Sequence, residues 1–146
     1  MQLPNEIFIP EIARLVAEGK QVLFTPTGVS MRPFIEGGVD SVTLVRADDL
    51  QVGDIVLAEI QPQHYVLHRI YALQDEQVTL MGDGNLYGQE HCTRSRLLAK
   101  VCAIHAPNGR SKTLTRARLW RHMLHTRRIW LKIYRHTCLK IINHKS

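Results

Sequence analysis

The chain has no long hydrophobic run. No stretch among its 146 residues approaches the roughly 20 consecutive apolar residues that cross a bilayer as a helix. The first residues, Met1 to Glu6, show no basic region followed by an apolar run, so the pattern of a secretory signal peptide is absent. We therefore expect neither a transmembrane helix nor a cleaved leader. The expected location is the cytoplasm, either in solution or at the inner membrane surface.

The chain also has few cysteines and no metal-binding motif. Cys92, Cys102 and Cys138 form no Cys-x-x-Cys pair, and their odd number argues against a disulfide framework. A reducing compartment is therefore expected. His64 and His68 would lie on one face of an expected strand, but no third ligand cluster accompanies them. We expect no metal and no cofactor.

The third absence is of acidic residues at the carboxyl end. Residues 111–146 contain ten Lys or Arg and no Asp or Glu, whereas residues 1–110 contain nine basic residues and all 13 acidic ones. The chain is therefore predicted to consist of a mildly acidic domain, residues 1–110, and a basic appendage, residues 111–146. A turn signal at Ala106–Gly109 marks the boundary between them.

The basic appendage is expected to form a long amphipathic helix over Leu114–Ile142. At about 100° per residue, its apolar residues, Trp120 and Trp130 included, gather on one side and most basic residues on the other. This pattern is typical of a helix on a membrane surface. It equally fits a helix that packs on the protein's own sheet or on a partner. Nucleic acid is the third alternative, because the charge suits phosphates but the tryptophans do not lie among the basic residues.

Residues 1–110 show the pattern of a mainly β fold. A short helix is expected over Pro10–Glu18, with the proline in its first turn and Gly19 as its stop. Short strand-like runs separated by turn signals follow, at Val22–Phe24, Val42–Val45, Ile55–Ile60, Tyr65–Leu73, Val78–Met81 and Leu97–Ile104. Because no long helix separates them, these runs predict a coiled, mostly antiparallel sheet or a partly open barrel.

Three short segments contain candidate catalytic residues. Ser30 lies in Gly28-Val29-Ser30-Met31-Arg32-Pro33, and a serine hydroxyl needs an adjacent base to become a nucleophile at neutral pH. His68 suits that role, because its ordinary pKa of about 6.5 leaves a neutral fraction at pH 7. Asp83 offers a carboxylate, although Gly82-Asp83-Gly84 is also turn chemistry. Because Gly28 has no Cβ, backbone N–H groups around Gly28 and Ser30 would be able to form an oxyanion hole.

These segments resemble, in order, the motifs of the signal peptidase I and LexA-type serine peptidases. The resemblance covers roughly residues 20 to 105 and depends on four boxes: Gly28-x-Ser30-Met31-x-Pro33, Leu50-x-x-Gly53-Asp54-Ile55-Val56, Val66-Leu67-His68-Arg69-Ile70 and Gly82-Asp83-Gly84-Asn85. It implies the folded β-sheet catalytic domain of that family. His68 followed by Arg69 resembles the Ser-His branch, since the common bacterial signal peptidases and LexA-type repressors have lysine as the base.

The resemblance also implies a third catalytic residue and a substrate. The Ser-His branch takes its third residue from an acidic position a few residues beyond the Gly-Asp-x-Asn box, where this chain has Leu86-Tyr87-Gly88-Gln89-Glu90. Asp83 is the first choice for this carboxylate, and Glu90 is the second. Arg69, on the opposite face of the strand from His68, is expected to be a structural ion-pair partner. The implied function is a serine endopeptidase that cleaves a leader or precursor peptide at a small residue.

Two other functions are compatible with the same motifs. A catalytically degenerate domain of this fold would bind peptides through its sheet edge without cutting them. Self-cleavage of the LexA type is disfavoured, because it needs a DNA-binding domain and a cleavable linker ahead of the catalytic domain. Only about 20 residues precede the first expected strand.

Overall fold

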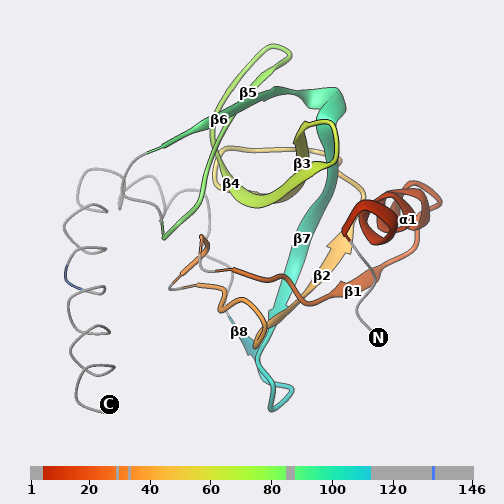
Figure 1. The fold of residues 1–146 in the computed structure, drawn as a ribbon, viewed down its shortest axis with the longest axis vertical. Coiled ribbons are helices and arrows are strands. Elements are labelled where there is room, and N and C mark those ends of the chain that lie inside the picture. The colour runs from red at the N-terminus through yellow and green to blue at the C-terminus, as the bar shows by residue number, and fades with distance from the viewer. Residues whose placement is uncertain (1–4, 29, 33, 85–87, 113–132, 134–146) are drawn as a thin grey trace.

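The computed structural model describes residues 5–28, 30–32, 34–84, 88–112 and 133 (Figure 1). These residues form a mainly β fold with one short helix at the amino end. The long helix expected over Leu114–Ile142 falls outside the described residues, apart from the exposed Ile133. None of the helices in the described ranges is long and apolar enough to cross a membrane.

Eight strands form one sheet. Their bounds are β1 Val22–Phe24, β2 Ser41–Val45, β3 Ile55–Gln61, β4 His64–Gln74, β5 Gln77–Met81, β6 Glu90–Thr93, β7 Leu97–His105 and β8 Ser111–Lys112. A single 3-10 turn, η1 Arg94–Arg96, separates β6 from β7. The six predicted strands are confirmed to within one residue at each end. Strands β6 and β8 were not predicted, because Glu90–Thr93 and Ser111–Lys112 are mostly polar and show no alternating apolar pattern.

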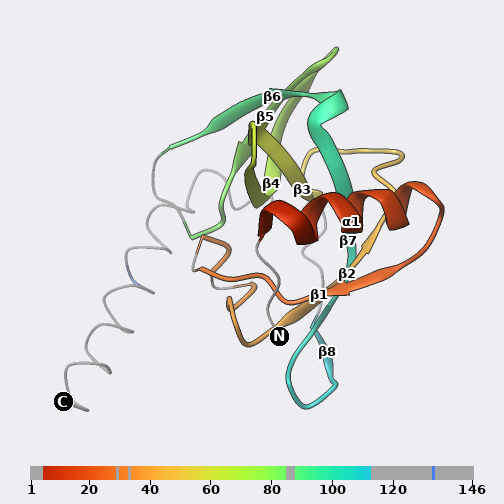
Figure 2. The same cartoon turned by 45° about the vertical axis from the view of Figure 1, so that its right-hand side comes forward.

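The sheet is antiparallel throughout the described pairings and curls into a half-barrel. Its strand order is β1-β2-β7-β3-β4-β5-β6, and β8 pairs with the end of β7 (Figures 1 and 2). Register shifts interrupt the ladders at several points, for example between Thr43 and Leu44 in β2 and between Ile70 and Ala72 in β4. Such irregularities bend a strand and increase its twist, which allows the sheet to curve around a core.

The helix α1, Asn5–Ala17, begins earlier than predicted. Pro10 lies inside the helix and not in its first turn, so the expected start at Pro10 is wrong. Gly19 ends the helix as predicted, with φ at +88°. The Gly19 N–H donates to Val16 O at 2.9 Å and the Lys20 N–H to Leu15 O at 3.1 Å. These two bonds form a Schellman motif, which satisfies carbonyls at the helix end.

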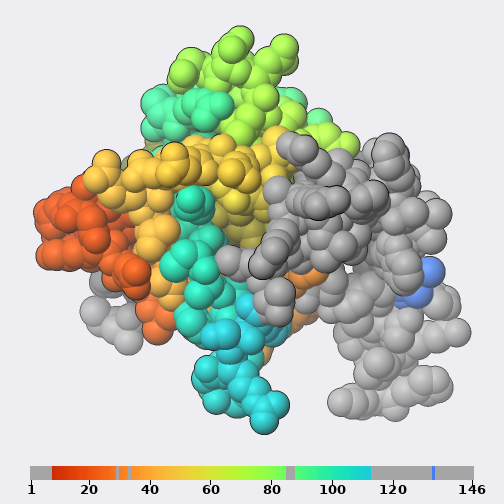
Figure 3. Space-filling model, turned by 180° about the vertical axis from the view of Figure 1, so that it is seen from behind, coloured from red at the N-terminus to blue at the C-terminus, as the bar shows by residue number. Residues whose placement is uncertain are grey.

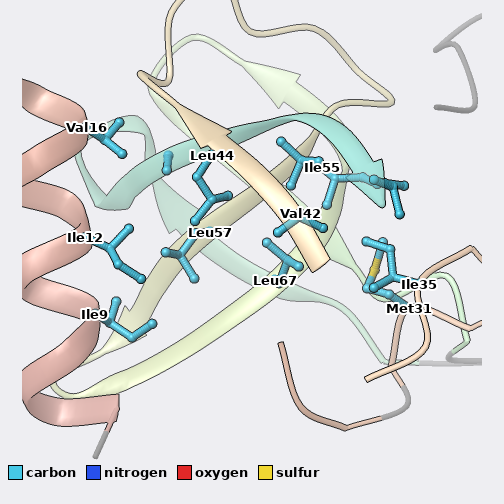
Figure 4. Packing of buried hydrophobic residues seen from close by; sticks show 13 residues of the cluster. Ile9, Ile12, Val16, Met31, Ile35, Val42, Leu44, Ile55, Leu57 and Leu67 are labelled. Carbon is cyan, nitrogen blue, oxygen red and sulfur yellow. The ribbon is translucent and has the colours of Figure 1, made fainter. Parts of the chain in front are cut away.

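Helix α1 closes one face of the half-barrel. It contacts β1 and β7, and Figure 2 shows it lying across this part of the sheet. Its buried residues Ile9, Ile12 and Val16 pack toward Leu44 and Leu57 of the sheet (Figure 4). Each such side chain contributes roughly 1.5–3 kcal/mol when it is fully removed from water. A second cluster, which includes Val56, Ile70 and Leu80, fills the β3–β4–β5 side.

The sheet extends beyond the predicted boundary at residue 110. Strand β8 pairs with β7 through Ile104↔Lys112 and His105↔Ser111. Seen from behind, the turn between β7 and β8 projects from the described surface (Figure 3). Ser111 and Lys112, assigned to the appendage by the sequence, therefore belong to the sheet.

Candidate active site

Ser30 lies in the loop of residues 25–40 that joins β1 to β2, here called the nucleophile loop. Two of its apolar residues, Met31 and Ile35, are buried in the main core beside Val42 and Ile55 (Figure 4). The N–H groups of Phe34 and Ile35 both donate to Met31 O at 3.0 Å, which forms a turn directly after Ser30. The loop is therefore anchored directly after the serine, although it is not part of the sheet.

Two glycines bring the ends of this loop together. The Gly38 N–H donates to Pro26 O at 2.6 Å. A Cβ placed on Gly37 would come within 1.9 Å of Gly28 O and 2.6 Å of Gly28 N, so only glycine fits there. Gly28 itself has φ at +88°, a region that other residues rarely adopt. Close packing of these backbones determines where the chain presents Ser30.

A second segment, the turn after β5, holds the serine from the other side. The Gly84 N–H donates to Ser30 O at 2.7 Å. The preceding Asp83 N–H points at Met31 Sδ at 3.5 Å. The predicted nucleophile and the Gly82-Asp83-Gly84 box are thus in direct contact.

His68 projects from β4 and is almost fully buried, with 5% of its surface exposed. Its Nδ1 lies 2.9 Å from Glu90 Oε2, and Glu90 is the first residue of β6. A carboxylate at Nδ1 stabilises the tautomer in which Nδ1 carries the proton and Nε2 carries the lone pair. The imidazole is therefore oriented for Nε2 to accept a proton.

Ser30 and His68 line the same cavity, which has a volume of about 130 Å³. No hydrogen bond joins Ser30 Oγ to His68 among the described residues. Every fully buried side-chain nitrogen or oxygen in those residues has a hydrogen-bond partner. Because His68 Nε2 has none there, it retains contact with the cavity. In ligand-free sites such catalytic hydrogen bonds are often long and shorten only when substrate binds.

Asp83 does not occupy the position predicted for it. Its two carboxylate oxygens accept hydrogen bonds from Arg69 Nε at 2.8 Å and Arg69 Nη2 at 2.7 Å, and both side chains are buried. The carboxylate placed against His68 is Glu90, the second choice. Consecutive residues of a strand point to opposite faces, so the carboxylate that reaches Arg69 is turned away from His68.

The expected structural role of Arg69 agrees with its contacts. Besides Asp83, its guanidinium donates to Gly53 O at 2.7 Å and lies 5.3 Å from the centre of the Phe34 ring. Gly53 belongs to the turn before β3, and Phe34 belongs to the nucleophile loop. Arg69, in the third sequence box, therefore binds the second box through Gly53 and the fourth box through Asp83, and it contacts the nucleophile loop through Phe34. A bidentate pair such as Arg69–Asp83 fixes orientation as well as charge.

Backbone N–H groups are available for an oxyanion hole. Neither the Gly28 nor the Ser30 N–H donates to another residue in the described part of the chain. Both residues line the cavity. Unpaired donors beside a nucleophile are what a developing oxyanion requires.

The titratable residues elsewhere form no comparable site. Within the described ranges, no three His, Cys, Asp or Glu residues lie close enough together to hold a metal ion. His64, at the start of β4, is exposed. Burial raises the pKa of the Cys92 thiol, with nearby Arg96 opposing this shift, and Cys102 is an exposed thiol. Cys138 lies outside the described residues.

One group of contacts escaped sequence reasoning. Arg32 pairs with Glu36 inside the nucleophile loop, and Asp40 at the end of the loop pairs with Lys112 of β8. The Arg32–Glu36 spacing of four residues is a recognisable signal for a helical turn. The pair between Asp40 and Lys112 has no sequence signal, since 72 positions separate the two residues.

Compared with models of protein families and with curated proteins, the chain shows no match.

Proposed function

We propose that the protein is a serine endopeptidase of the signal peptidase type, Ser-His branch. Ser30 is the nucleophile, His68 the general base, and Glu90 the carboxylate that orients His68. The observation that carries the proposal is the placement of His68, held at Nδ1 by Glu90, on the same small cavity as Ser30. This order of nucleophile, base and orienting group is the arrangement that activates serine in acyl transfer.

The chemistry follows from the two nitrogens of His68. Ser30 Oγ attacks the scissile carbonyl carbon while its proton passes to Nε2, and the carbonyl oxygen becomes an oxyanion. The N–H groups of Gly28 and Ser30 stabilise that charge. The imidazolium, stabilised by Glu90, then protonates the leaving amine as the C–N bond breaks. Water attacks the resulting ester with His68 again as base, which releases the acid and restores Ser30.

The strand edge beside the cavity favours an extended peptide as substrate. Strand β5 pairs with β4 only from Arg69 onward, whereas β3 pairs along the other edge of β4 from His64. Among the described strands, none pairs with Val66 and Leu67 on that side, and both residues line the cavity together with Pro26, Thr27 and Gly28. A substrate strand would hydrogen-bond to this edge by β-augmentation. The small cavity favours a small side chain next to the scissile bond.

We further propose that the basic appendage supplies a peripheral membrane contact. Beyond Lys112, which pairs with Asp40 in the sheet, residues 113–146 contain nine basic residues and no acid, and each basic residue near an anionic surface contributes about 1 kcal/mol to binding. The protein would then act in the cytoplasm or at the inner membrane surface on a leader or precursor peptide. Replacing Arg127, Arg128, Lys132 and Arg135 by Gln in the full chain should abolish sedimentation with anionic vesicles. Equal sedimentation of both proteins would contradict the contact.

A catalytically degenerate peptide-binding module is the second candidate. It is favoured by one observation, the lack of a Ser30–His68 hydrogen bond among the described residues. Such a module would use the same β4 edge and cavity but would not transfer an acyl group.

Labelling with a fluorophosphonate probe distinguishes the two candidates. The probe phosphonylates an activated serine, so the wild type should be labelled at Ser30, and Ser30→Ala should not be labelled. Ser95→Ala is the matched control, because Ser95 is exposed and hydrogen-bonded to Thr93 in a distant turn. Absence of label on a folded wild-type protein that still binds peptides would favour the module.

A further inference from the structure

Asp40 is a buried carboxylate at the end of the nucleophile loop, with 1% of its surface exposed. It directly precedes β2. A buried carboxylate is costly unless hydrogen bonds and an opposite charge compensate it. Asp40 has both, and they come from two different parts of the chain.

Toward the loop, Asp40 and Glu36 are joined twice. The Glu36 N–H donates to Asp40 Oδ2 at 2.8 Å, and the Asp40 N–H donates to Glu36 O at 2.9 Å. The Glu36 carboxylate in turn accepts from Arg32 Nε at 2.8 Å and Nη2 at 2.6 Å. Arg32 lies two positions after Ser30. A continuous set of contacts therefore connects Asp40 to the turn that presents the nucleophile.

Toward the sheet, Asp40 is held by Lys112 of β8. Lys112 Nζ lies 2.6 Å from Asp40 Oδ2, the same oxygen that accepts the Glu36 N–H. The Lys112 backbone is fixed by its pairing with Ile104 of β7, and the side chain is partly shielded from solvent. This cation is thus positioned by the sheet and not by the loop.

The charge of Lys112 affects the state of Asp40. Burial acts to raise the pKa of Asp40, but the hydrogen bonds from Lys112 and the Glu36 N–H, together with the Lys112 charge, outweigh burial and hold the pKa below its ordinary value. Without Lys112, only the Glu36 N–H would compensate the burial of this carboxylate. Hydrogen bonds to an ionised carboxylate are roughly twice as strong as neutral ones, so both contacts of Asp40 hold the loop more firmly than neutral bonds would.

We propose that Lys112 is a positioning residue for the nucleophile: through Asp40 and Glu36 it holds the loop that presents Ser30, so β8 is part of the catalytic unit. This inference rests on the proposed function for the meaning of Ser30, but the ordering of the loop can be measured independently. It also assigns a role to a strand that the sequence placed in the appendage. An exposed lysine pair would contribute little, whereas here the acceptor is buried and bonded to the loop.

The test compares Lys112→Met, Lys112→Arg and Lys100→Met in the full chain. Lys100 of β7 is the matched control, since its Nζ donates to Asp48 O, which lies outside the nucleophile loop. Amide hydrogen exchange in peptides covering residues 26–40 should be at least tenfold faster in Lys112→Met, nearly normal in Lys112→Arg and unchanged in Lys100→Met. Thermal melting checks that each variant is folded.

The fluorophosphonate labelling rate at Ser30 gives the functional measurement. We expect about a tenfold loss in Lys112→Met, recovery in Lys112→Arg, and no further loss when Asp40→Asn is added to Lys112→Met, because both residues act through one contact. Exchange in residues 26–40 that is unchanged in Lys112→Met would overturn the positioning role. If the wild type is not labelled at all, the proposed function fails, while the exchange result still decides whether Lys112 holds the loop.

Discussion

Two hydrogen-bonded pairs, each of a basic side chain with a carboxylate, involve neighbouring residues of β4, and their environments differ. Arg69 and Asp83 have side chains that are 1% and 2% exposed, and two hydrogen bonds join them. His68 and Glu90 are joined by one contact, with Glu90 27% exposed and His68 facing a cavity. Arg69 and Asp83 thus join β4 to the turns before β3 and after β5. The contact between His68 and Glu90 instead leaves His68 Nε2 without a protein partner among the described residues.

The largest difference between the pairs should appear in activity when the histidine is removed. His68→Ala should lower the Ser30 labelling rate by on the order of 10⁴-fold or more, because the serine loses its proton acceptor. The melting temperature should change little. His91→Ala is the control, since His91 is exposed on β6 and contacts Thr79. A labelling rate in His68→Ala close to that of His91→Ala would remove His68 from the mechanism.

Breaking the structural pair should instead reduce stability. Asp83→Asn leaves the buried Arg69 charge without its carboxylate, which typically costs about 3–5 kcal/mol in the free energy of unfolding. Urea unfolding followed by circular dichroism measures this loss. Labelling of Ser30 should fall mainly as the folded fraction falls. A stable Asp83→Asn protein with no activity would instead return Asp83 to a catalytic role.

Replacing Glu90, the proposed orienting carboxylate, should have a smaller effect than replacing His68, the proposed base. Glu90→Gln keeps the shape of the side chain, but its amide can donate to Nδ1 and so favour the wrong tautomer of His68. We expect a loss of roughly 10²-fold in the labelling rate, about 2.7 kcal/mol in the barrier. Stability should be nearly unchanged, because Glu90 is partly exposed. Equal labelling rates for Glu90→Gln and wild type would mean that Ser30 and His68 act as a dyad without Glu90.

The cavity can be altered without touching either pair. Gly37→Ala places a methyl group 1.9 Å from Gly28 O, so the backbone of the nucleophile loop must shift. Overpacking of this kind typically costs about 1–3 kcal/mol. Labelling should fall even where the protein remains folded, because Gly28 and Ser30 move together. Gly109→Ala is a control on the β7–β8 turn, where no neighbour contacts the added methyl but the positive φ is strained. Equal labelling of Ser30 in Gly37→Ala and Gly109→Ala would mean that Gly37 does not determine the position of Ser30.

The smallest expected effect concerns pH. The folded-state pKa of Asp40 is lowered, so its stabilising contribution is present above the unfolded-state pKa of about 3.9 and is lost as pH falls through the folded value. The free-energy difference between wild type and Asp40→Asn should therefore be constant above about pH 5 and shrink below pH 4. Urea unfolding at several pH values measures it. A difference that does not depend on pH would mean that Asp40 acts by shape alone.

Much of the fold could be predicted because the signals are local. Alternating apolar residues marked the longer strands, and Gly19 marked the end of α1. Pro10 misled the prediction of the helix start, since packing of Ile9, Ile12 and Val16 on the sheet stabilises a helix that continues through the proline. Strands β6 and β8 depend on ladders with β5 and β7, and a two-residue strand such as β8 has no pattern of its own.

The sequence by itself determined the antiparallel sheet, the placement of Ser30 and His68 on separate segments, and the charge difference between the two ends of the chain, since these depend on residue type and periodicity. Only the tertiary structure decided which carboxylate meets which partner. Asp83 lies on the connection after β5, and Glu90 is the first residue of β6. The pairing of Glu90 with Leu80 places Glu90 beside His68, while Asp83 pairs with Arg69. Sheet register and the alternation of side chains determine which carboxylate pairs with His68 and which with Arg69. Neither can be read from residues 82–90 alone, because both depend on how β5 and β6 pair with the rest of the sheet.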